Sequence, residues 1–394
     1  MARIYVLGSI IPVPGLKREN DIILRTYHEI RKRKNITYRF AKSINYTNRV
    51  LKFFHPKFNV FHRLNNLVNY KEPAFNTDVM FYRWFSFKNS VRLKSLLAPL
   101  NFWLFGGKVL KDVISFSPDL IHANNMFSDG YMAYRIKKQL NIPYILTLRC
   151  DPKYDLMKDI TCFNILNNAS VIICHNFELF ERYRKFFPIH RLPHGIDQKI
   201  FKKRILPYTK NDTFRILTVS RLLDWKNIDL LINSITSLCY QGFDIQYTII
   251  GEGPEGDKLN SMIAELDMDK RIRIKPWVNQ SELFNEFEKH HLLALVSYPE
   301  TLGRVYFEAI ACSLPILCAK NSGSYGLISD VHGGQYSELD KEMVSEKVID
   351  IMNDYYRIAE NAQNGSDYLK QFDWNNVSDF YFSTIMNLKN RSTH

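Results

Sequence analysis

Residues 215–226 read Arg-Ile-Leu-Thr-Val-Ser-Arg-Leu-Leu-Asp-Trp-Lys, an apolar run that ends in a loop carrying two cations, Arg221 and Lys226. A segment long enough for a helix follows this run. The pattern recurs through the second half of the chain, where further strands are predicted at 246–251, 271–275, 292–296 and 315–319. Because strands that alternate with helices pair in parallel and are covered on both faces, we predict a doubly wound α/β domain here.

The first half of the chain repeats this pattern less regularly. Its predicted strands are at 3–7, 79–82, 120–122, 144–148 and 171–174. A chain of 394 residues suits two domains, and the periodicity is lost after the turn Leu192-Pro-His-Gly-Ile-Asp197. We therefore predict a Rossmann-like domain at 1–200, a second one at 201–372, and a C-terminal helix at 373–394 that returns to the first domain.

Charge is distributed unevenly between the two halves. Residues 1–200 contain 32 Lys+Arg against 14 Asp+Glu, and the remainder contains 21 against 26, so the halves carry +18 and −5. This asymmetry favours an anionic partner for the first half, either phospholipid head groups or nucleic acid, although a merely solvated surface also accounts for it. The most apolar stretch, Leu96–Phe105, is broken by Pro99 and Asn101, so no membrane-spanning segment is expected. The first residues lack the features of a signal peptide, and a cytoplasmic location is expected.

Candidate functional residues follow the predicted strands, where ligands bind in open α/β sheets. Arg221 and Lys226 follow the first strand of the second half, and Gly251-Glu-Gly-Pro254 follows the next. Residues 297–312 follow the fourth strand and contain Glu300 and Glu308, with seven residues between them. We expect Glu300 in a loop and Glu308 on a helix that begins near Gly303. The positive end of that helix suits a diphosphate, and the flanking carboxylates suit sugar hydroxyls, so the pattern indicates a nucleotide sugar.

The chain resembles the family 4 retaining glycosyltransferases (glycosyl transferases group 1), most closely from Ile216 to Ala319. Pro118-Asp-Leu-Ile-His122, Asn141-Ile-Pro-Tyr-Ile-Leu-Thr147 and Pro193-His-Gly-Ile-Asp197 extend the similarity to the first half. The resemblance implies a GT-B fold, in which two Rossmann-like domains face each other across a cleft. The domain at 1–200 is then the acceptor side and the domain at 201–372 the nucleotide-sugar side.

The resemblance also implies roles for individual residues. Glu300 would lie by the hydroxyls of the transferred sugar, Glu308 would hold the ribose, and Arg221 with Lys226 would neutralise the diphosphate, so that neither a divalent metal nor another cofactor is expected. The remaining donor-binding candidates are Gly15, Gly251, Thr301, Leu302, Gly303, Arg304 and Val305. On the acceptor or sugar side the candidates are His122, Arg149 and Asp151.

Several positions depart from the family pattern. Arg149 stands where the family usually has a histidine near the reacting centre, so the role of that histidine does not transfer. Thr301 and Leu302 replace Gly-Phe, while Asn227 and Ser313 each replace a glycine.

We expect a retaining hexosyltransferase that moves a sugar from a nucleotide diphosphate donor to a saccharide acceptor. A lipid-linked acceptor in cell-surface polysaccharide assembly is favoured, with the basic first half on the anionic inner face of the plasma membrane and no nucleic-acid partner. Two alternatives remain open: a GT-B nucleotide-sugar 2-epimerase, and a basic binding protein without catalytic activity.

Overall fold

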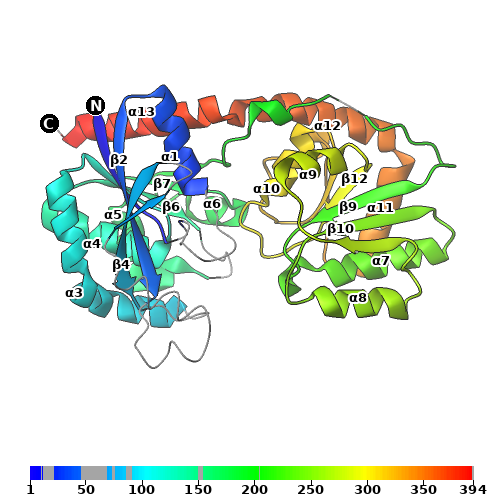
Figure 1. The fold of residues 1–394 in the computed structure, drawn as a ribbon, viewed down its shortest axis with the longest axis horizontal. Coiled ribbons are helices and arrows are strands. Elements are labelled where there is room, and N and C mark those ends of the chain that lie inside the picture. The colour runs from blue at the N-terminus through cyan, green and yellow to red at the C-terminus, as the bar shows by residue number, and fades with distance from the viewer. Residues whose placement is uncertain are drawn as a thin grey trace. The chain divides into compact units, whose positions relative to one another are not determined.

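A computed structural model describes residues 1–9, 11, 22–45, 69–72, 76–85, 91–149, 154–203 and 205–392. The backbone forms two compact units (Figure 1). Unit 1 comprises Met1–His175, Leu179–Gly195 and Trp374–His394, and unit 2 comprises Asn176–Glu178 and Ile196–Asp373. Each unit is an α/β domain built around one sheet.

The sheet of unit 1 has, within the described residues, eight strands in the order β3-β4-β2-β1-β5-β6-β7-β8. The strands are β1 (Ala2–Leu7), β2 (Ile36–Asn45), β3 (Asn69–Glu72), β4 (Thr77–Trp84), β5 (Leu120–Ala123), β6 (Tyr144–Leu148), β7 (Val171–Cys174) and β8 (Ile189–Arg191). All neighbouring strands pair in parallel except β3 with β4. The strand order reverses between β1 and β5, as in a Rossmann fold. The five strands predicted in this half are confirmed, whereas β2, β3 and β8 were not predicted.

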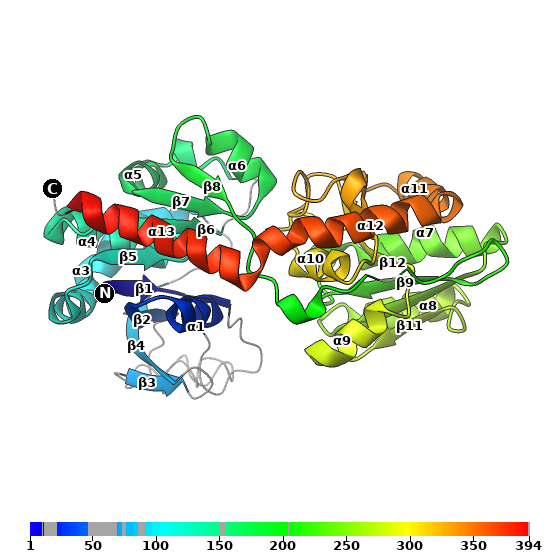
Figure 2. The same ribbon diagram turned by 90° about the horizontal axis from the view of Figure 1, so that it is seen from above.

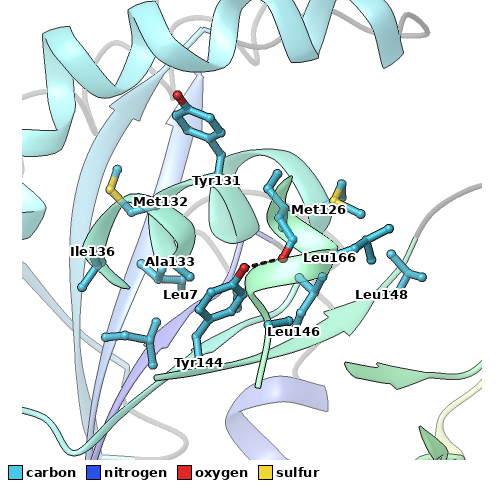
Figure 3. Close-up of a cluster of buried hydrophobic side chains, with 14 of the residues drawn as sticks. Leu7, Met126, Tyr131, Met132, Ala133, Ile136, Tyr144, Leu146, Leu148 and Leu166 are labelled. Atoms are coloured by element: carbon cyan, nitrogen blue, oxygen red, sulfur yellow. Dashed lines mark hydrogen bonds between the residues drawn. The ribbon is translucent and has the colours of Figure 1, made fainter. Parts of the chain in front are cut away.

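Helices of unit 1 bury one apolar face each against this sheet. They are α1 (Ile22–Arg33), α3 (Val91–Phe116), α4 (Tyr131–Leu140), α5 (Ile160–Asn168) and α13 (Trp374–Ser392), and α6 (Phe177–Tyr183) begins at residues assigned to unit 2. Figure 3 shows part of the core, where Leu7, Leu146 and Leu148 of the sheet pack with Met132 and Ile136 of α4. The hydroxyl of Tyr144 donates a hydrogen bond to the carbonyl of Ile165 in the same cluster.

Helix α13 is part of unit 1, although it lies at the end of the chain. It packs beside α1 and contacts β1 and β5 (Figure 2). The chain passes from unit 1 to unit 2 after Gly195 and returns after Asp373. Ile196 N donates to Phe372 O at 2.9 Å, so the two crossing segments are hydrogen-bonded to each other.

The sheet of unit 2 has the order β11-β10-β9-β12-β13-β14, and its described neighbours all pair in parallel. The strands are β9 (Phe214–Val219), β10 (Ile245–Ile250), β11 (Ile272–Lys275), β12 (Leu292–Leu295), β13 (Ile316–Ala319) and β14 (Gly334–Ser337). The helices are α7 (Ile228–Tyr240), α8 (Gly256–Glu265), α9 (Gln280–Phe287), α10 (Arg304–Ala311), α11 (Lys341–Asn353) and α12 (Tyr355–Leu369). Helices α7 and α8 lie on one face of the sheet, and α9 and α10 lie on the other (Figure 1).

The predicted fold class is therefore confirmed: the chain contains two Rossmann-like, doubly wound domains. All five strands predicted in the second half are present, and β14 was missed. Among the described residues, no helix is both long and apolar enough to cross a membrane.

Two glycines after β10 allow the loops after β9 and β10 to pack backbone against backbone. A Cβ atom on Gly251 would lie 1.8 Å from the carbonyl oxygen of Ser220, and one on Gly253 would lie 2.1 Å from that of Leu222. Leu222 N donates to Glu252 O at 3.0 Å across the same contact. Only glycine fits these positions without displacing the neighbouring backbone, so the β10 loop supports the shape of the β9 loop.

We predict that Gly251→Ala lowers the free energy of unfolding by about 3 kcal/mol or more, because its new methyl group overlaps a backbone atom that has no side-chain freedom. Gly256→Ala is the matched control in the same segment, since its Cβ would meet only Leu222 Cδ1 at 3.5 Å. The control should be neutral or slightly stabilising. Urea unfolding of both variants measures the difference, and equal stability would contradict the backbone contact.

Candidate active site

The site forms where the strand order of unit 2 reverses, between β9 and β12. The loop after β9 carries Lys226 and the loop after β12 carries Glu300. Lys226 Nζ lies 2.5 Å from Glu300 Oε2, and each side chain is 15% exposed. The structure thus joins two residues that are 74 positions apart in the sequence and were both predicted to be functional.

Neighbouring groups fix the Glu300 carboxylate in place. Thr301 N donates to Oε1 at 3.1 Å, and the hydroxyl of Ser297 donates to Oε2 at 3.0 Å. Ser297 is fully buried, and the hydroxyl of Tyr306 donates to the carbonyl of Leu295 close by, at 2.6 Å. Lys226, Thr301 and Ser297 together leave the Glu300 carboxylate little rotational freedom, as a preorganised site requires.

Asn227 explains how the chain tolerates the loss of a family glycine. It has a φ of +50°, a left-handed conformation that asparagine adopts more readily than most residues. Its side-chain amide donates to Val296 O at 2.8 Å, which ties the β9 loop to the β12 loop. Ser313, the other substituted glycine, has a φ of +60° and donates to Lys202 O at 2.6 Å. Both residues have a positive φ, a conformation that glycine adopts without strain, and each donates a side-chain hydrogen bond.

Helix α10 begins at Arg304, which confirms the predicted helix start near Gly303. Gly303 has a φ of +67°, and a Cβ there would lie 2.2 Å from the Tyr306 ring. No side chain of the described residues caps this helix, so its first N–H groups, including those of Arg304 and Val305, can bind an anion. Arg221, after β9, is exposed.

Glu308 lies one turn into α10, as predicted. Its Oε1 is 3.3 Å from an Nη atom of Arg304, and its side chain is 17% exposed. Leu302 is buried in the core of unit 2, so only its backbone is available to a ligand. Thr301 is half-buried beside Glu300.

Gly251, a donor-binding candidate, lies in the loop after β10, beside the site. The close contact that requires a glycine there is with the backbone of the β9 loop. The candidates Gly15 and Asp151 lie outside the described residues.

His122, a candidate on the acceptor or sugar side, is buried at the end of β5. It is 1% exposed; Nδ1 is 2.5 Å from the hydroxyl of Tyr27, and Nε2 is 2.8 Å from that of Thr147. Burial, and secondarily the charge of Arg149, lowers its pKa to about 3. Both ring nitrogens are therefore hydrogen-bonded to side chains of unit 1.

Arg149 forms a basic cluster with His175 and His194 of unit 1, two histidines that were not among the predicted site residues. One guanidinium NH2 group donates to His194 Nε2 at 3.2 Å, and the His194 ring lies 4.3 Å from that of His175. Arg149 Nε and His175 Nε2 are both buried and have no hydrogen-bond partner among the described residues. Burial lowers the pKa of Arg149 to about 10 and, with the Arg149 charge, that of His175 to about 3.

The tautomer of His175 follows from its other nitrogen. Nδ1 lies 2.5 Å from the carbonyl oxygen of Leu192, which only accepts, so Nδ1 carries the proton. Nε2 of the neutral ring then presents a lone pair, whereas Arg149 Nε presents an N–H. Among the described residues the cluster therefore lacks one donor and one acceptor, and a ligand hydroxyl or a water molecule would satisfy both groups.

The geometry of unit 2 combines an anion site with hydrogen-bond acceptors. Arg221, Lys226 and the start of α10 supply positive potential at the carboxyl ends of β9 and β12, where Rossmann-like domains bind phosphates. Glu300 and Glu308 supply carboxylates that accept hydrogen bonds from hydroxyl groups. No single sequence motif contains this set, because it is assembled from separate loops.

Family models and known proteins match this architecture. Glycosyl transferases group 1 matches residues 199–368, and Glycosyltransferase Family 4 matches residues 70–199. An uncharacterized glycosyltransferase of Methanocaldococcus jannaschii is 25% identical over 279 residues, or 68% of this chain and 75% of that protein. Alpha-monoglucosyldiacylglycerol synthase of Acholeplasma laidlawii is 23% identical over 278 residues, or 62% of this chain and 69% of that protein.

Solved structures share the fold over nearly the whole chain. Sucrose-phosphate synthase from Thermosynechococcus elongatus has a TM-score of 0.73 at 16% identity, covering 98% of this chain and 99% of that one. Anabaena HepE in complex with UDP and glucose has a TM-score of 0.67 at 16% identity, covering 98% and 100%. The two adjoining family matches and these relatives agree with one another, and the chain belongs to the family 4, group 1 glycosyltransferases.

Proposed function

We propose that this glycosyltransferase retains the anomeric configuration and takes its sugar from a nucleotide diphosphate donor bound by unit 2. The observation that carries the proposal is the Lys226–Glu300 pair beside the uncapped start of α10. It places a cation for a diphosphate next to a fixed carboxylate for a sugar. UDP and glucose bound to Anabaena HepE support this class of donor.

In this proposal different residues of unit 2 bind different parts of the donor. Lys226, Arg221 and the N–H groups of Arg304 and Val305 stabilise the charge that develops on the leaving diphosphate. A preorganised donor of this type contributes about 3 to 4 kcal/mol to catalysis. Glu300 accepts hydrogen bonds from the transferred sugar, and Glu308 exchanges its contact with Arg304 for the ribose hydroxyls. Because cations and helix N–H groups balance the diphosphate, no divalent metal is required.

We assign the acceptor to unit 1, where Arg149 lies in the basic cluster. A hydroxyl group both accepts and donates, so it can supply the partners that Arg149 Nε and the His175 Nε2 lone pair do not find within the described ranges. The acceptor is therefore proposed to be a saccharide, and Arg149 to contact one of its hydroxyls. The similarity to alpha-monoglucosyldiacylglycerol synthase supports an acceptor that is linked to a lipid. We propose that the reaction belongs to cell-surface polysaccharide assembly.

Helix α3 gives unit 1 a surface suited to a membrane. Its buried stripe includes Ala98, Phe102 and Val109, whereas another stripe leaves Leu96 68% exposed and Trp103 79% exposed. Leu93, Leu100 and Leu104 extend the exposed stripe at helical spacing, and the exposed Arg92 and Lys111 add positive charge. An apolar stripe with basic residues is typical of helices that lie in the interface of an anionic membrane. We propose that unit 1 docks peripherally through α3 on the inner face of the plasma membrane.

The reaction is tested with a donor labelled in its sugar, assayed in excess EDTA. We expect label to be transferred to the acceptor without added metal, because Arg221 and Lys226 neutralise the diphosphate. Activity that vanishes in EDTA and returns with magnesium or manganese would reject the metal-free mechanism. Free epimerised sugar would identify an epimerase, and the absence of any product with the full donor and acceptor panel would identify a binding protein.

Substitutions of Glu300 and Glu308 should affect different kinetic parameters. Glu300→Gln is expected to lower kcat at least about 100-fold with donor binding retained, because its charge and hydrogen bonds act on the reacting sugar. Glu308→Ala should raise the donor KM about 10-fold or more and abolish donor-induced thermal stabilisation, since a hydrogen bond to a charged group is lost. Glu360→Ala, an exposed position on α12, is the control. Near-normal turnover of Glu300→Gln, or unchanged donor affinity of Glu308→Ala, rules out that residue's assignment.

Membrane docking should depend on the exposed stripe of α3. Leu96→Glu combined with Trp103→Glu is expected to weaken co-sedimentation with anionic vesicles at least about 10-fold, because two acids replace apolar contacts beside basic residues. Val331→Glu with Met343→Glu makes the same change at exposed positions of unit 2 and should have no effect. Binding should also fade at 1 M salt, where the Debye length is about 3 Å. Equal binding of all variants, or equal binding to neutral vesicles, contradicts this docking mode.

A further inference from the structure

A polar groove of about 250 Å³ lies on unit 2, on the face of the sheet that α9 covers only in part. Leu283 and Phe287 of α9 pack on Leu217, Val219 and Ile250, which lie near the carboxyl ends of β9 and β10. The preceding residues on the same face are polar. They form the floor of the groove, and the end of α9 forms its wall.

The groove is separate from the candidate active site. Its floor includes Arg215, Gln246 and Arg273, each the second residue of its strand. The active-site loops follow the opposite ends of the strands. At about 3.3 Å per residue, Arg215 lies roughly 16 Å along the strand direction from the start of the β9 loop at Ser220.

Positive charge dominates the lining although unit 2 belongs to the acidic half of the chain. Arg215, Arg273, Lys275 and Lys289 line the groove against one carboxylate, Glu286. Glu286 already pairs with Lys275 at 3.1 Å and Lys289 at 3.3 Å. Within the described part of the chain, no ion pair engages either arginine. Arg273 Nε donates to the hydroxyl of Thr248 at 3.4 Å. His290 also lines the groove, and burial lowers its pKa to about 4, so it adds no charge at neutral pH.

Protection of the sheet edge does not account for these charges. Cations on an edge strand such as β11 prevent pairing with other chains. Arg215, however, lies on β9, the third strand from that edge, where a doubly wound sheet is normally covered by a helix. An arginine on an open face of an interior strand requires another explanation.

The spacing of the two arginines indicates the size of the ligand. Arg215 pairs in register with Gln246, and Arg273 pairs with Thr248, two residues further along β10. With strands about 4.8 Å apart and 3.3 Å per residue, their Cα atoms are about 12 Å apart, across β10 from one another. Both arginines line the groove, and guanidinium groups on Cα atoms this far apart can flank an anion longer than a single phosphate. Thr248 and Gln246, between them, offer a hydroxyl and an amide as neutral donors.

We propose that this groove binds a soluble oligophosphate, an anion with at least two phosphoryl groups, at a site distinct from the donor site. Arg215 and Arg273 each hold one phosphoryl group through paired N–H donors, the geometry in which guanidinium groups bind phosphate. Lys275 and Lys289 supply the remaining positive potential from the rim.

Inorganic pyrophosphate is the probe, measured by isothermal titration calorimetry on the full-length chain at constant ionic strength. The background is Lys226→Gln, which weakens pyrophosphate binding at the donor site. In this background, Arg215→Gln with Arg273→Gln should weaken pyrophosphate binding at least about 10-fold. Lys210→Gln with Lys270→Gln removes two charges from exposed positions of unit 2 outside the groove and should change it less than about 2-fold. Unchanged binding in the arginine variant, or equal weakening in the lysine control, overturns the proposal.

Three further measurements separate loss of the groove from loss of the fold and from lipid binding. Arg215→Lys with Arg273→Lys retains the charge and protects the fold, and a loss of affinity there supports paired N–H donors. Thermal unfolding without ligand identifies any variant that has lost its structure. If the glutamine variant is unfolded, the affinity of the lysine variant decides the outcome instead. Vesicles containing phosphatidylglycerol provide the other source of phosphate. If the arginine variant loses vesicle binding while pyrophosphate binding is unchanged, the groove holds lipid head groups and the soluble ligand is rejected.

Discussion

The ion pair between Lys226 and Glu300 connects the two loops on either side of the switch point of unit 2, and the candidate site depends on it. Lys226 is positioned by a loop that rests on Gly251 and Gly253 of the next loop. Glu300 is held by Ser297 and by the backbone of Thr301. Without a ligand the two charges satisfy one another, which removes the cost of leaving either unpaired in a half-buried position. We propose that a bound diphosphate takes over Lys226 and leaves Glu300 to the sugar.

Polar groups gather at the carboxyl ends of the strands in both units, but they differ in how they are satisfied. In unit 2 the charges of Lys226 and Glu300 pair with each other, as do those of Arg304 and Glu308. In unit 1, Arg149 Nε and His175 Nε2 are buried without a partner among the described residues. A hydroxyl that both donates and accepts completes that cluster without adding charge. This difference supports our assignment of the charged donor to unit 2 and a saccharide acceptor to unit 1.

Regular alternation of apolar strands and helices was enough to predict the fold class and ten of the strands. Short or polar strands were not predicted because they lack an apolar run. Examples are Gly334-Gln-Tyr-Ser337 in β14 and the three residues of β8. Strand-end position predicted that Lys226 and Glu300 follow strands of one sheet, but their pairing across 74 residues could not be read from spacing. The burial of His122 could not be read from the sequence, because a strand end does not reveal what covers it. Tyr381, on a helix more than 250 residues later, lies with its ring 5.7 Å from that of His122.

The most direct test of this account is the dissociation constant of nucleoside diphosphates (UDP, GDP and ADP) for Lys226→Gln and Glu300→Gln, measured by calorimetry. If Lys226 binds the diphosphate and Glu300 competes with the diphosphate for Lys226, the two substitutions should change nucleotide affinity in opposite directions. Lys226→Gln should weaken binding of the preferred nucleotide at least about 10-fold, because it removes a cation and leaves a carboxylate near the phosphates. Glu300→Gln should leave binding unchanged or tighten it. Equal weakening by both substitutions would show that the pair only maintains the loops, and unchanged binding in Lys226→Gln would place the diphosphate elsewhere.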